Sequence, residues 1–468
     1  MRVGSVSFVG SVVLAVALAT VAPTSSAVAD QGVPVPVSGA TARQSTGIPQ
    51  CAWPLEAEPA KANFAYPDTD STYWILPYQV GSITSIVING KFTNARFFSI
   101  ETYGANHDDF TSSNGVTSAI IDYQIAPNAG YKNPFIQTAK SGGKYQVTVQ
   151  SGNSVSGQNV IPLAPPNTAA GSIGYVWFRV YLPKGGNFDK VVLPKVQINT
   201  TASTSVVLKT CPSAKSPAHV GRAQAAPASK LGLQAGFNAL KAGTQTQEGP
   251  PPICGGQCPI PMSFNRTIPS VSGAVFPNEA NAYLSAVFTP RNKYVVLVRG
   301  KAPVTPGIYK PGTNPWPWPN AKFQLRYYSM CNDLWRRPEP VIVNTLPNGS
   351  VDDGCRADKN TKLNNDGYYT YVVANENQKA AVSRKKNVTY VPTSLKTPHA
   401  PEALILRNML PSDDFLDNGA GPAVQNVPQN QNPVQAAQQM GVYYPRMISC
   451  PLKFYLKNGP NACYSTYG

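Results

Sequence analysis

The sequence predicts an all-β fold of two tandem, jelly-roll-like antiparallel β-sandwich domains joined by a flexible linker. Short runs of Val, Ile, Thr, Tyr and Phe are separated by Gly, Pro, Asn and Ser, and 45 of the 468 residues are Pro. Such punctuated β-branched and aromatic runs are typical of the strands of a sandwich or jelly roll.

A sequence repeat predicts that the two domains are related. Residues 86–91, Ile-Val-Ile-Asn-Gly-Lys, correspond to residues 296–301, Val-Leu-Val-Arg-Gly-Lys. The run Arg-Phe-Phe-Ser at residues 96–99 corresponds to Arg-Tyr-Tyr-Ser at residues 326–329. Each copy is long enough to bury a core of its own.

The N-terminus predicts export. Arg2 precedes an apolar run, Val6–Val21, and small residues end at Ala29, which predicts a signal peptide over residues 1–29 that is cleaved after Ala29. A membrane anchor is the alternative, but Gly10 interrupts the run, which is shorter than the roughly 20 residues of a spanning helix. No later stretch is apolar enough to span a bilayer, so we expect a secreted protein without a transmembrane segment.

Composition changes predict the order of the remaining segments. They are a disordered leader (30–50), a first β-sandwich (51–211), an Ala, Pro and Lys-rich linker (212–253), a second β-sandwich (254–420), and a Gln and Asn-rich segment with a disulfide-stapled tail (421–468). Helical patterns are confined to Leu231–Ala242 and Pro433–Met440. The run at residues 175–181 is too apolar for one exposed face, so we expect a central strand covered on both sides.

Eight cysteines in an exported chain predict disulfides. From their positions we expect the pairs Cys51 with Cys211, Cys254 with Cys258, Cys331 with Cys355, and Cys450 with Cys463. The alternative for Cys254 and Cys258 is a redox or zinc site, but the chain has only three His, none of them nearby in the sequence.

The order of several motifs resembles a bacterial jelly-roll domain of unknown function, the twelve-fourteen type. The motifs are Tyr73-Trp74, residues 86–91, residues 94–103 and residues 178–183, and the resemblance covers about residues 66–198, with a weaker version over 283–415. It implies a jelly-roll sandwich and no established reaction. This chain repeats the domain and lacks the family's usual partner domain, so no activity of that partner is carried over.

The formal net charge of +16 favours anionic partners such as acidic polysaccharide, wall polymer or a membrane surface. The alternative is that the charge only maintains solubility. No nucleic-acid partner is expected, because the chain contains no basic helix or nucleic-acid module.

Four arginines lie inside the repeated aromatic strands: Arg96, Arg326, Arg179 and Arg407. One interpretation is an internal salt-bridge network that is repeated with the fold. The other is a basic cleft that binds a carboxylate, a sulfate or a sugar acid, since guanidinium groups bind such anions in a bidentate manner.

Candidates for catalysis or metal binding are weak. Glu101 with Asp122 could act as a carboxylate pair on a glycan, and His107 with Asp109 could act as a general base or a metal site. No Gly-x-Ser-x-Gly motif occurs. The oxygen-rich stretch around Cys355 offers calcium ligands, Asp353, Asp358 and Asp366, although a turn-rich disulfide loop explains the same residues.

The second copy contains an insertion, residues 302–325, that carries Trp316 and Trp318 between prolines. Indole faces stack on sugar rings or prolyl ligands, so these residues are candidates for ligand binding. The alternative is a lid whose indoles cover the domain's own core.

Together these features favour a secreted, non-catalytic protein that binds an extracellular or cell-wall polymer, anionic or carbohydrate, through basic and aromatic surfaces. Calcium is the one cofactor that the sequence suggests. Two alternatives remain: a secreted jelly-roll hydrolase acting on a glycan or ester, and a structural component of an extracellular layer.

Overall fold

The computed structural model describes residues 47–59, 62–137, 139, 142–212, 260–266, 276–307, 318–319, 322–336, 339–429 and 432–465. The predicted signal peptide, most of the leader, the linker beyond residue 212, Cys254, Cys258 and Trp316 lie outside these ranges. The described residues form an all-β structure with short helices, as predicted.

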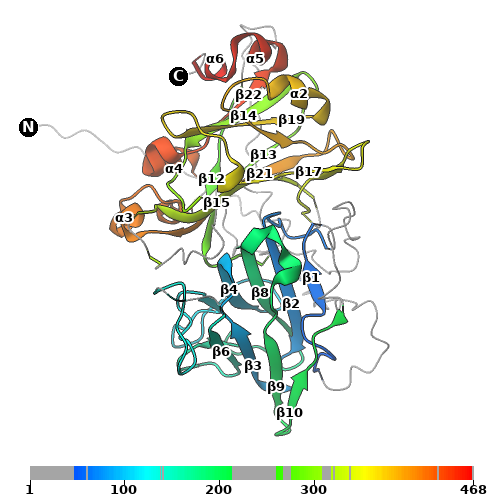
Figure 1. Ribbon diagram of the computed structural model, residues 1–468, viewed down its shortest axis with the longest axis vertical. Helices are drawn as coiled ribbons and strands as arrows, with labels where there is room; N and C mark the ends of the chain where they lie inside the picture. The colour runs from blue at the N-terminus through cyan, green and yellow to red at the C-terminus, as the bar shows by residue number, and fades with distance from the viewer. Residues whose placement is uncertain are drawn as a thin grey trace, which may run out of the picture. The chain divides into compact units, whose positions relative to one another are not determined.

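The first sandwich consists of two five-stranded sheets, drawn in blue to green in Figure 1. One sheet has the order β1-β2-β8-β4-β5 and the other β10-β9-β3-β6-β7. The strands are β1 (Leu55–Ala57), β2 (Ser71–Gln79), β3 (Ile83–Lys91), β4 (Ala95–Tyr103), β5 (Ala119–Ile121), β6 (Lys144–Gln150), β7 (Val160–Pro162), β8 (Ile173–Pro183), β9 (Lys195–Thr200) and β10 (Ser205–Leu208).

The second sandwich has sheets β12-β13-β21-β15-β18 and β11-β22-β14-β19-β20, which repeat this arrangement except at one edge, where β11 precedes the other strands while β10 follows β9. A parallel strand pairing also recurs among the described strands, β6 with β7 and β19 with β20. The strands are β11 (Ile260–Met262), β12 (Asn265–Arg266), β13 (Asn281–Phe288), β14 (Tyr294–Lys301), β15 (Leu325–Leu334), β18 (Cys355–Ala357), β19 (Tyr368–Ala374), β20 (Thr389–Pro392), β21 (Glu402–Pro411) and β22 (Arg446–Pro451), with a separate hairpin of β16 (Val343–Thr345) and β17 (Val351–Asp353).

The described helices are short, and none of them is long and apolar enough to cross a membrane. The α-helices are α2 (Lys379–Val382), α3 (Asp413–Leu416), α4 (Pro433–Met440), α5 (Leu452–Asn458) and α6 (Pro460–Ser465). The 3-10 turns are η1 (Lys184–Gly186), η2 (Phe188–Lys190), η7 (Asp358–Asn360), η8 (Glu376–Gln378), η9 (Asp417–Gly419), η10 (Val424–Asn426) and η11 (Gly441–Tyr443). Helix α4 has the predicted bounds, with Asn432 accepting from the backbone at its N-terminus.

Alternation of side chains explains how each sandwich closes. In β3, Ile86 and Ile88 point into the core, whereas Asn89 and Lys91 point to solvent. The Gly of the repeated Gly-Lys motif is required by packing, because a Cβ at Gly90 would overlap the ring of Tyr145. The repeated motif thus specifies the strand at the centre of this sheet.

Strand β8 is buried on both faces, as predicted for residues 175–181. Phe178 and its neighbours on that face join the core between the two sheets of the first sandwich. Trp177 and Tyr181, on the other face, belong to a second cluster that includes Tyr327 and Met409 of the second sandwich. The near-continuous apolar run therefore reflects two separate hydrophobic contacts.

The two sandwiches contact each other through one sheet of each, which we call the inner sheets: β1-β2-β8-β4-β5 and β12-β13-β21-β15-β18. Their shared cluster contains aromatic residues of both copies. The other two sheets, the outer sheets, lie on the sides of their sandwiches away from this contact.

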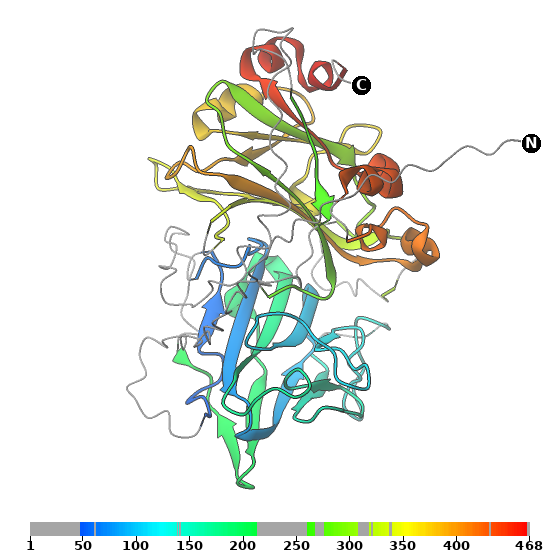
Figure 2. The same ribbon diagram turned by 180° about the vertical axis from the view of Figure 1, so that it is seen from behind.

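The second sandwich extends beyond the predicted boundary at residue 420. Strand β22, from the predicted tail, pairs with β14 in the outer sheet, and α4 packs on the core through Ala436 and Met440. Helices α5 and α6, red in Figure 1 and Figure 2, lie beside β22. Because residues 418–439 are rich in Gln and Asn, the sequence did not indicate that the chain rejoins the second sandwich after them.

Three of the predicted disulfides are present: Cys51–Cys211, Cys331–Cys355 and Cys450–Cys463. The first joins the two ends of the first sandwich, and the third joins β22 to α6. Each of them lies within one copy.

Candidate functional site

The first repeated arginine pair lies inside the protein, where the two sandwiches meet. Arg326 donates from Nη1 and Nη2 to the two carboxylate oxygens of Asp122, at 2.8 and 2.9 Å, and from Nε to the backbone oxygen of Arg96 at 2.8 Å. Arg96 donates to Asp358 Oδ1 at 2.6 Å. Asp122 and Asp358 are equivalent, because each directly follows the edge strand of its inner sheet, β5 or β18. The two copies therefore exchange the same ion pair in both directions.

The second arginine pair makes a similar reciprocal exchange with backbone oxygens. Arg179 donates to the backbone oxygen of Phe276 at 2.7 Å, and Arg407 donates to that of Tyr66. Phe276 and Tyr66 precede the equivalent strands β13 and β2, and both have a positive φ, 57° and 50°. Arg179 is also neutralised by Glu101, 2.6 Å away. The contact between the copies thus has approximate two-fold symmetry.

The four arginines do not form the predicted anion-binding cleft. Their side chains are enclosed, with the most exposed, Arg407, at 2%. The physical reason is that carboxylates and carbonyl groups of this chain already meet the guanidinium groups, as a buried charge requires. Burial raises the pKa of the Asp122 carboxyl, and the charge of Arg326 opposes that rise. The internal salt-bridge interpretation describes these residues.

The two carboxylates considered for hydrolysis, Glu101 and Asp122, each form an ion pair with a different arginine. Glu101 accepts from Arg179 and from the hydroxyl of Ser99 at 2.6 Å, and it is 1% exposed. Asp122 is fully buried and binds Arg326. The structure therefore assigns the two carboxylates to different arginines and does not bring them together as an acid pair.

The loop at His107 gathers acidic groups from both copies. The His107 ring packs against aromatic rings at the contact of the sandwiches. Burial, together with a hydrogen bond to Asp109, raises the pKa of Asp108 to about 7. Burial and the charges of Glu101 and Asp109 raise the pKa of Glu279 to about 7. Glu279 comes from the second copy, and its position beside Asp109 was not visible in the sequence.

The calcium candidates bind separate partners. Asp353 accepts from the Thr69 hydroxyl at 2.8 Å and Asp358 pairs with Arg96, while Asp366 is exposed in a turn. Among the described residues, the group with metal-ligand spacing is Asp68, Cys331 and Cys355, but the two sulfurs form a disulfide. Asp353, Asp358 and Asp366 are therefore not gathered around one ion position.

Trp318 is a packing residue of the contact between the copies. Its side chain is 3% exposed and belongs to the shared cluster. Its ring lies 5.8 Å from the guanidinium carbon of Arg326, and its backbone N–H donates to Phe135 at 2.7 Å. The Trp318 indole is thus buried at the contact between the two copies, which differs both from an exposed ligand-binding ring and from a cover over the second domain's own core.

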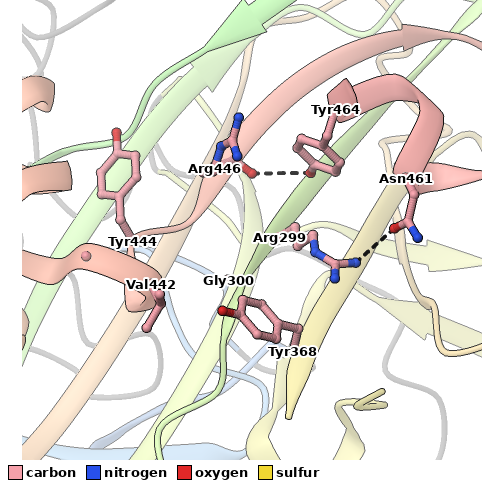
Figure 3. A pocket seen from close by; sticks show the side chains of 9 residues that line it. Arg299, Gly300, Tyr368, Val442, Tyr444, Arg446, Asn461 and Tyr464 are labelled. Carbon is pink, nitrogen blue, oxygen red and sulfur yellow. Dashed lines mark hydrogen bonds between the residues drawn. The ribbon is translucent and has the colours of Figure 1, made fainter. Parts of the chain in front are cut away.

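An open pocket lies elsewhere, on the outer sheet of the second sandwich, and has a volume of about 470 Å³. Figure 3 shows its walls, which come from β14, β19, β22, η11 and α6. Aromatic and basic side chains dominate the lining, which comprises Arg299, Gly300, Tyr368, Gly441, Val442, Tyr444, Arg446, Asn461 and Tyr464.

The pocket contains two like charges in direct opposition. Arg299 on β14 and Arg446 on β22 are register partners, so their side chains project from the same face of the sheet. Arg299 Nη1 donates to Asn461 Oδ1 at 3.1 Å. Within the described part of the chain, no carboxylate lies within ion-pair distance of either arginine. Opposed like charges are unfavourable on a sheet, and a bound anion would relieve the repulsion.

Tyrosine rings flank both arginines. The guanidinium carbon of Arg299 lies 5.2 Å from the ring centre of Tyr368, and that of Arg446 lies 5.9 Å from Tyr464. The Tyr464 hydroxyl donates to the backbone oxygen of Arg446 at 3.3 Å. Burial raises the pKa of Tyr464, although Arg299 and Arg446 oppose the rise, so its hydroxyl stays neutral and remains a donor.

The C-terminal segment builds one wall of this pocket. Cys450–Cys463 ties β22 to α6, which carries Asn461 and Tyr464. Tyr455 of α5 packs in a cluster with residues of β14 and β19 and fixes the segment on the sheet. A sequence signal for the site did exist, because alternation in Val-Leu-Val-Arg-Gly-Lys places Arg299 on the outer face.

Comparisons with known proteins leave this geometry without an assigned role. No family model matches the sequence, and no curated protein matches it. An uncharacterised protein from Burkholderia cenocepacia is similar in structure, with 9% identity, a TM-score of 0.45, and coverage of 84% of this chain and 80% of that one. The VPA0106 protein from Vibrio parahaemolyticus has 12% identity, a TM-score of 0.36, and coverage of 83% and 91%. At these scores neither similarity bears on function.

Proposed function

We propose that the protein is exported and binds an anionic extracellular or cell-wall polysaccharide in the pocket between Arg299 and Arg446. The observation that carries this proposal is the direct opposition of these two arginines, without a carboxylate partner among the described residues, in a pocket walled by tyrosines. The net charge of +16 favours the approach of such a polymer. The three disulfides support export.

The chemistry of the pocket fits acidic sugar units. A guanidinium group donates two parallel hydrogen bonds to a carboxylate or sulfate. Tyr368 and Tyr464 offer ring surface for the apolar face of a sugar, and Asn461 offers an amide for a hydroxyl. A hydrolase and a layer component remain alternatives without a specific observation in their favour.

Isothermal titration with a short oligogalacturonate, a carboxylated saccharide, tests the proposal. The double variant Arg299→Gln, Arg446→Gln should bind at least about tenfold more weakly, because a hydrogen bond to a charged group contributes about 1.5 to 3 kcal/mol. Tyr368→Ala should also weaken binding. Titrations with heparin fragments and with polyphosphate show whether the pocket also binds sulfate or phosphate groups. A titration with dextran shows whether it binds a neutral polysaccharide.

Arg291→Gln is the matched control. Arg291 is exposed, as Arg446 is, and lies 5.8 Å from the centre of a tyrosine ring, that of Tyr294, but it does not line the pocket. Its substitution should leave the affinity unchanged. Equal affinity of the wild type and the Arg299, Arg446 double variant would remove the pocket from consideration.

A further inference from the structure

The duplication places a second basic surface on the first sandwich, at the position that corresponds to the pocket. Strands β3, β6 and β9 occupy the places of β14, β19 and β22 in the outer sheet. By this register, Asn89 corresponds to Arg299 and Lys195 corresponds to Arg446, since each pair is directly opposed across the same two strands. The equivalent surface thus carries one basic group at this position, Lys195, where the pocket carries two.

Lysines surround this position. Lys91 and Lys144 are register partners on β3 and β6, and Lys195 lies opposite Asn89 on β9. All three lysines are exposed. The Lys144 amine lies 5.6 Å from the ring centre of Tyr131, which is 41% exposed. We call Lys91, Lys144, Lys195 and Tyr131 the lysine face.

The described strands of the outer sheets carry charges of one sign, whereas those of the inner sheets carry both signs. The described strands of the two outer sheets contain no Asp or Glu, while they carry six basic residues: Lys91, Lys144, Lys195, Arg299, Lys301 and Arg446. The described inner-sheet strands, in contrast, combine six arginines with four acids, Glu56, Glu101, Asp333 and Glu402. A face that serves only solubility would intersperse both signs.

We propose that the lysine face is a second site for the acidic polysaccharide, so that one protein chain holds two polymer molecules. This inference rests on the proposed function of the pocket. The lysine face suits a carboxylated polymer because its ammonium groups supply charge, the Tyr131 ring supplies a stacking surface, and Asn89 supplies an amide.

The position of the outer sheets would let one protein chain bind two separate polymer molecules. The inner sheets meet at the contact between the sandwiches, and the outer sheets lie on the sides away from it. The pocket and the lysine face therefore belong to surfaces directed away from each other. The protein would cross-link neighbouring polymer molecules instead of binding one polymer molecule at two positions.

The test is the stoichiometry of short oligogalacturonate on the full-length protein, followed by a bridging assay. In the bridging assay, protein bound to immobilised polygalacturonate captures a second, fluorescent polygalacturonate from solution. The wild type should bind two oligomers per chain and should capture the second polymer. The triple variant Lys91→Ala, Lys144→Ala, Lys195→Ala should bind one oligomer with the affinity of the pocket and should lose the capture.

A variant of equal charge change controls for general electrostatics. Arg384→Ala, Lys386→Ala, Lys453→Ala removes three exposed basic residues that lie on neither the pocket nor the lysine face. This control should keep two sites and the capture of the second polymer.

The outcomes separate the two proposals. One oligomer per wild-type chain, unaffected by the lysine substitutions, overturns the lysine face and leaves the pocket in place. One oligomer that is lost with the lysine substitutions, and unaffected by Arg299→Gln, Arg446→Gln, overturns the pocket instead. An absence of binding by the wild type overturns both.

Discussion

Arg326 and Asp122 lie 204 residues apart in the chain and form a two-pronged ion pair with both side chains fully buried. The pair joins one copy of the duplicated sandwich to the other, and Arg96 with Asp358 repeats it in the opposite direction. The most strongly repeated residues of the sequence therefore stabilise the contact between the copies. The two binding sites that we propose lie instead on the outer sheets.

Arg326→Met should destabilise the protein by about 3 to 5 kcal/mol, because the substitution leaves Asp122 as a buried charge without its partner. Urea unfolding followed by fluorescence measures the change. Lys379→Met provides the comparison, since the Lys379 side chain is 38% exposed where it pairs with Asp352. Loss of the Lys379–Asp352 ion pair should lower the free energy of unfolding by no more than about 1 kcal/mol. Equal effects of the two substitutions would contradict the role given to Arg326.

Cutting the chain between the copies should leave them associated. A protease site placed within residues 213–259 allows the folded, full-length protein to be cut, and each described disulfide lies within one copy. The shared apolar cluster and the reciprocal ion pairs should hold the fragments together in gel filtration. Under the same conditions, fragments carrying Asp122→Asn and Asp358→Asn should separate more readily. If the wild-type fragments separated immediately after cleavage, the contact between the two sandwiches would be weak.

Removal of the Cys450–Cys463 disulfide should weaken binding of oligogalacturonate severalfold. The bond holds α6, and with it Asn461 and Tyr464, beside β22. The variant Cys450→Ser, Cys463→Ser tests this by titration. The variant Cys51→Ser, Cys211→Ser is the control, because that disulfide belongs to the first sandwich and should affect stability without affecting the pocket.

Glu402 should make the protein more stable as the pH falls from 8 towards 5. Burial raises the pKa of Glu402 to about 8, although hydrogen bonds from Ser394 and Asn332 oppose the rise. The folded protein therefore binds a proton that the unfolded chain, with an ordinary carboxyl pKa, has released, so stability falls as the pH rises through this window.

Glu402→Gln should remove this part of the pH dependence. Urea unfolding at several pH values between 5 and 8 measures the slope, and the exposed carboxylate Asp366 supplies the control Asp366→Asn. A slope that is unchanged in the Glu402→Gln variant would show that this carboxyl does not carry the effect.

The sequence predicted the fold well because the fold depends on local patterns. Alternation in β3, the double-sided apolar run of β8 and the repeated landmarks each follow from residues close together in the chain. The bounds of α4 followed from its alanines and glutamines. The predicted end of the second sandwich came too early, because the pairing of β22 with β14 joins residues far apart in the sequence.

The candidate site was harder to predict, for a physical reason. An arginine within an aromatic strand has the same sequence context whether it meets an internal carboxylate or an external anion. Arg326 and Arg299 lie on different sheets and face different surroundings. Arg326 meets Asp122 of the other copy, whereas Arg299 lies opposite Arg446. Alternation places Arg299 on the outer face, but the groups that meet the two guanidinium groups come from distant segments, so the residue pattern did not reveal them.

A crystal structure of the protein with bound oligogalacturonate is the most direct test of the proposed pocket. The result we predict is density for a sugar carboxylate between the guanidinium groups of Arg299 and Arg446, with a sugar ring against Tyr368 or Tyr464. Density at another surface, with the pocket empty at a saturating concentration of the oligomer, would contradict the account.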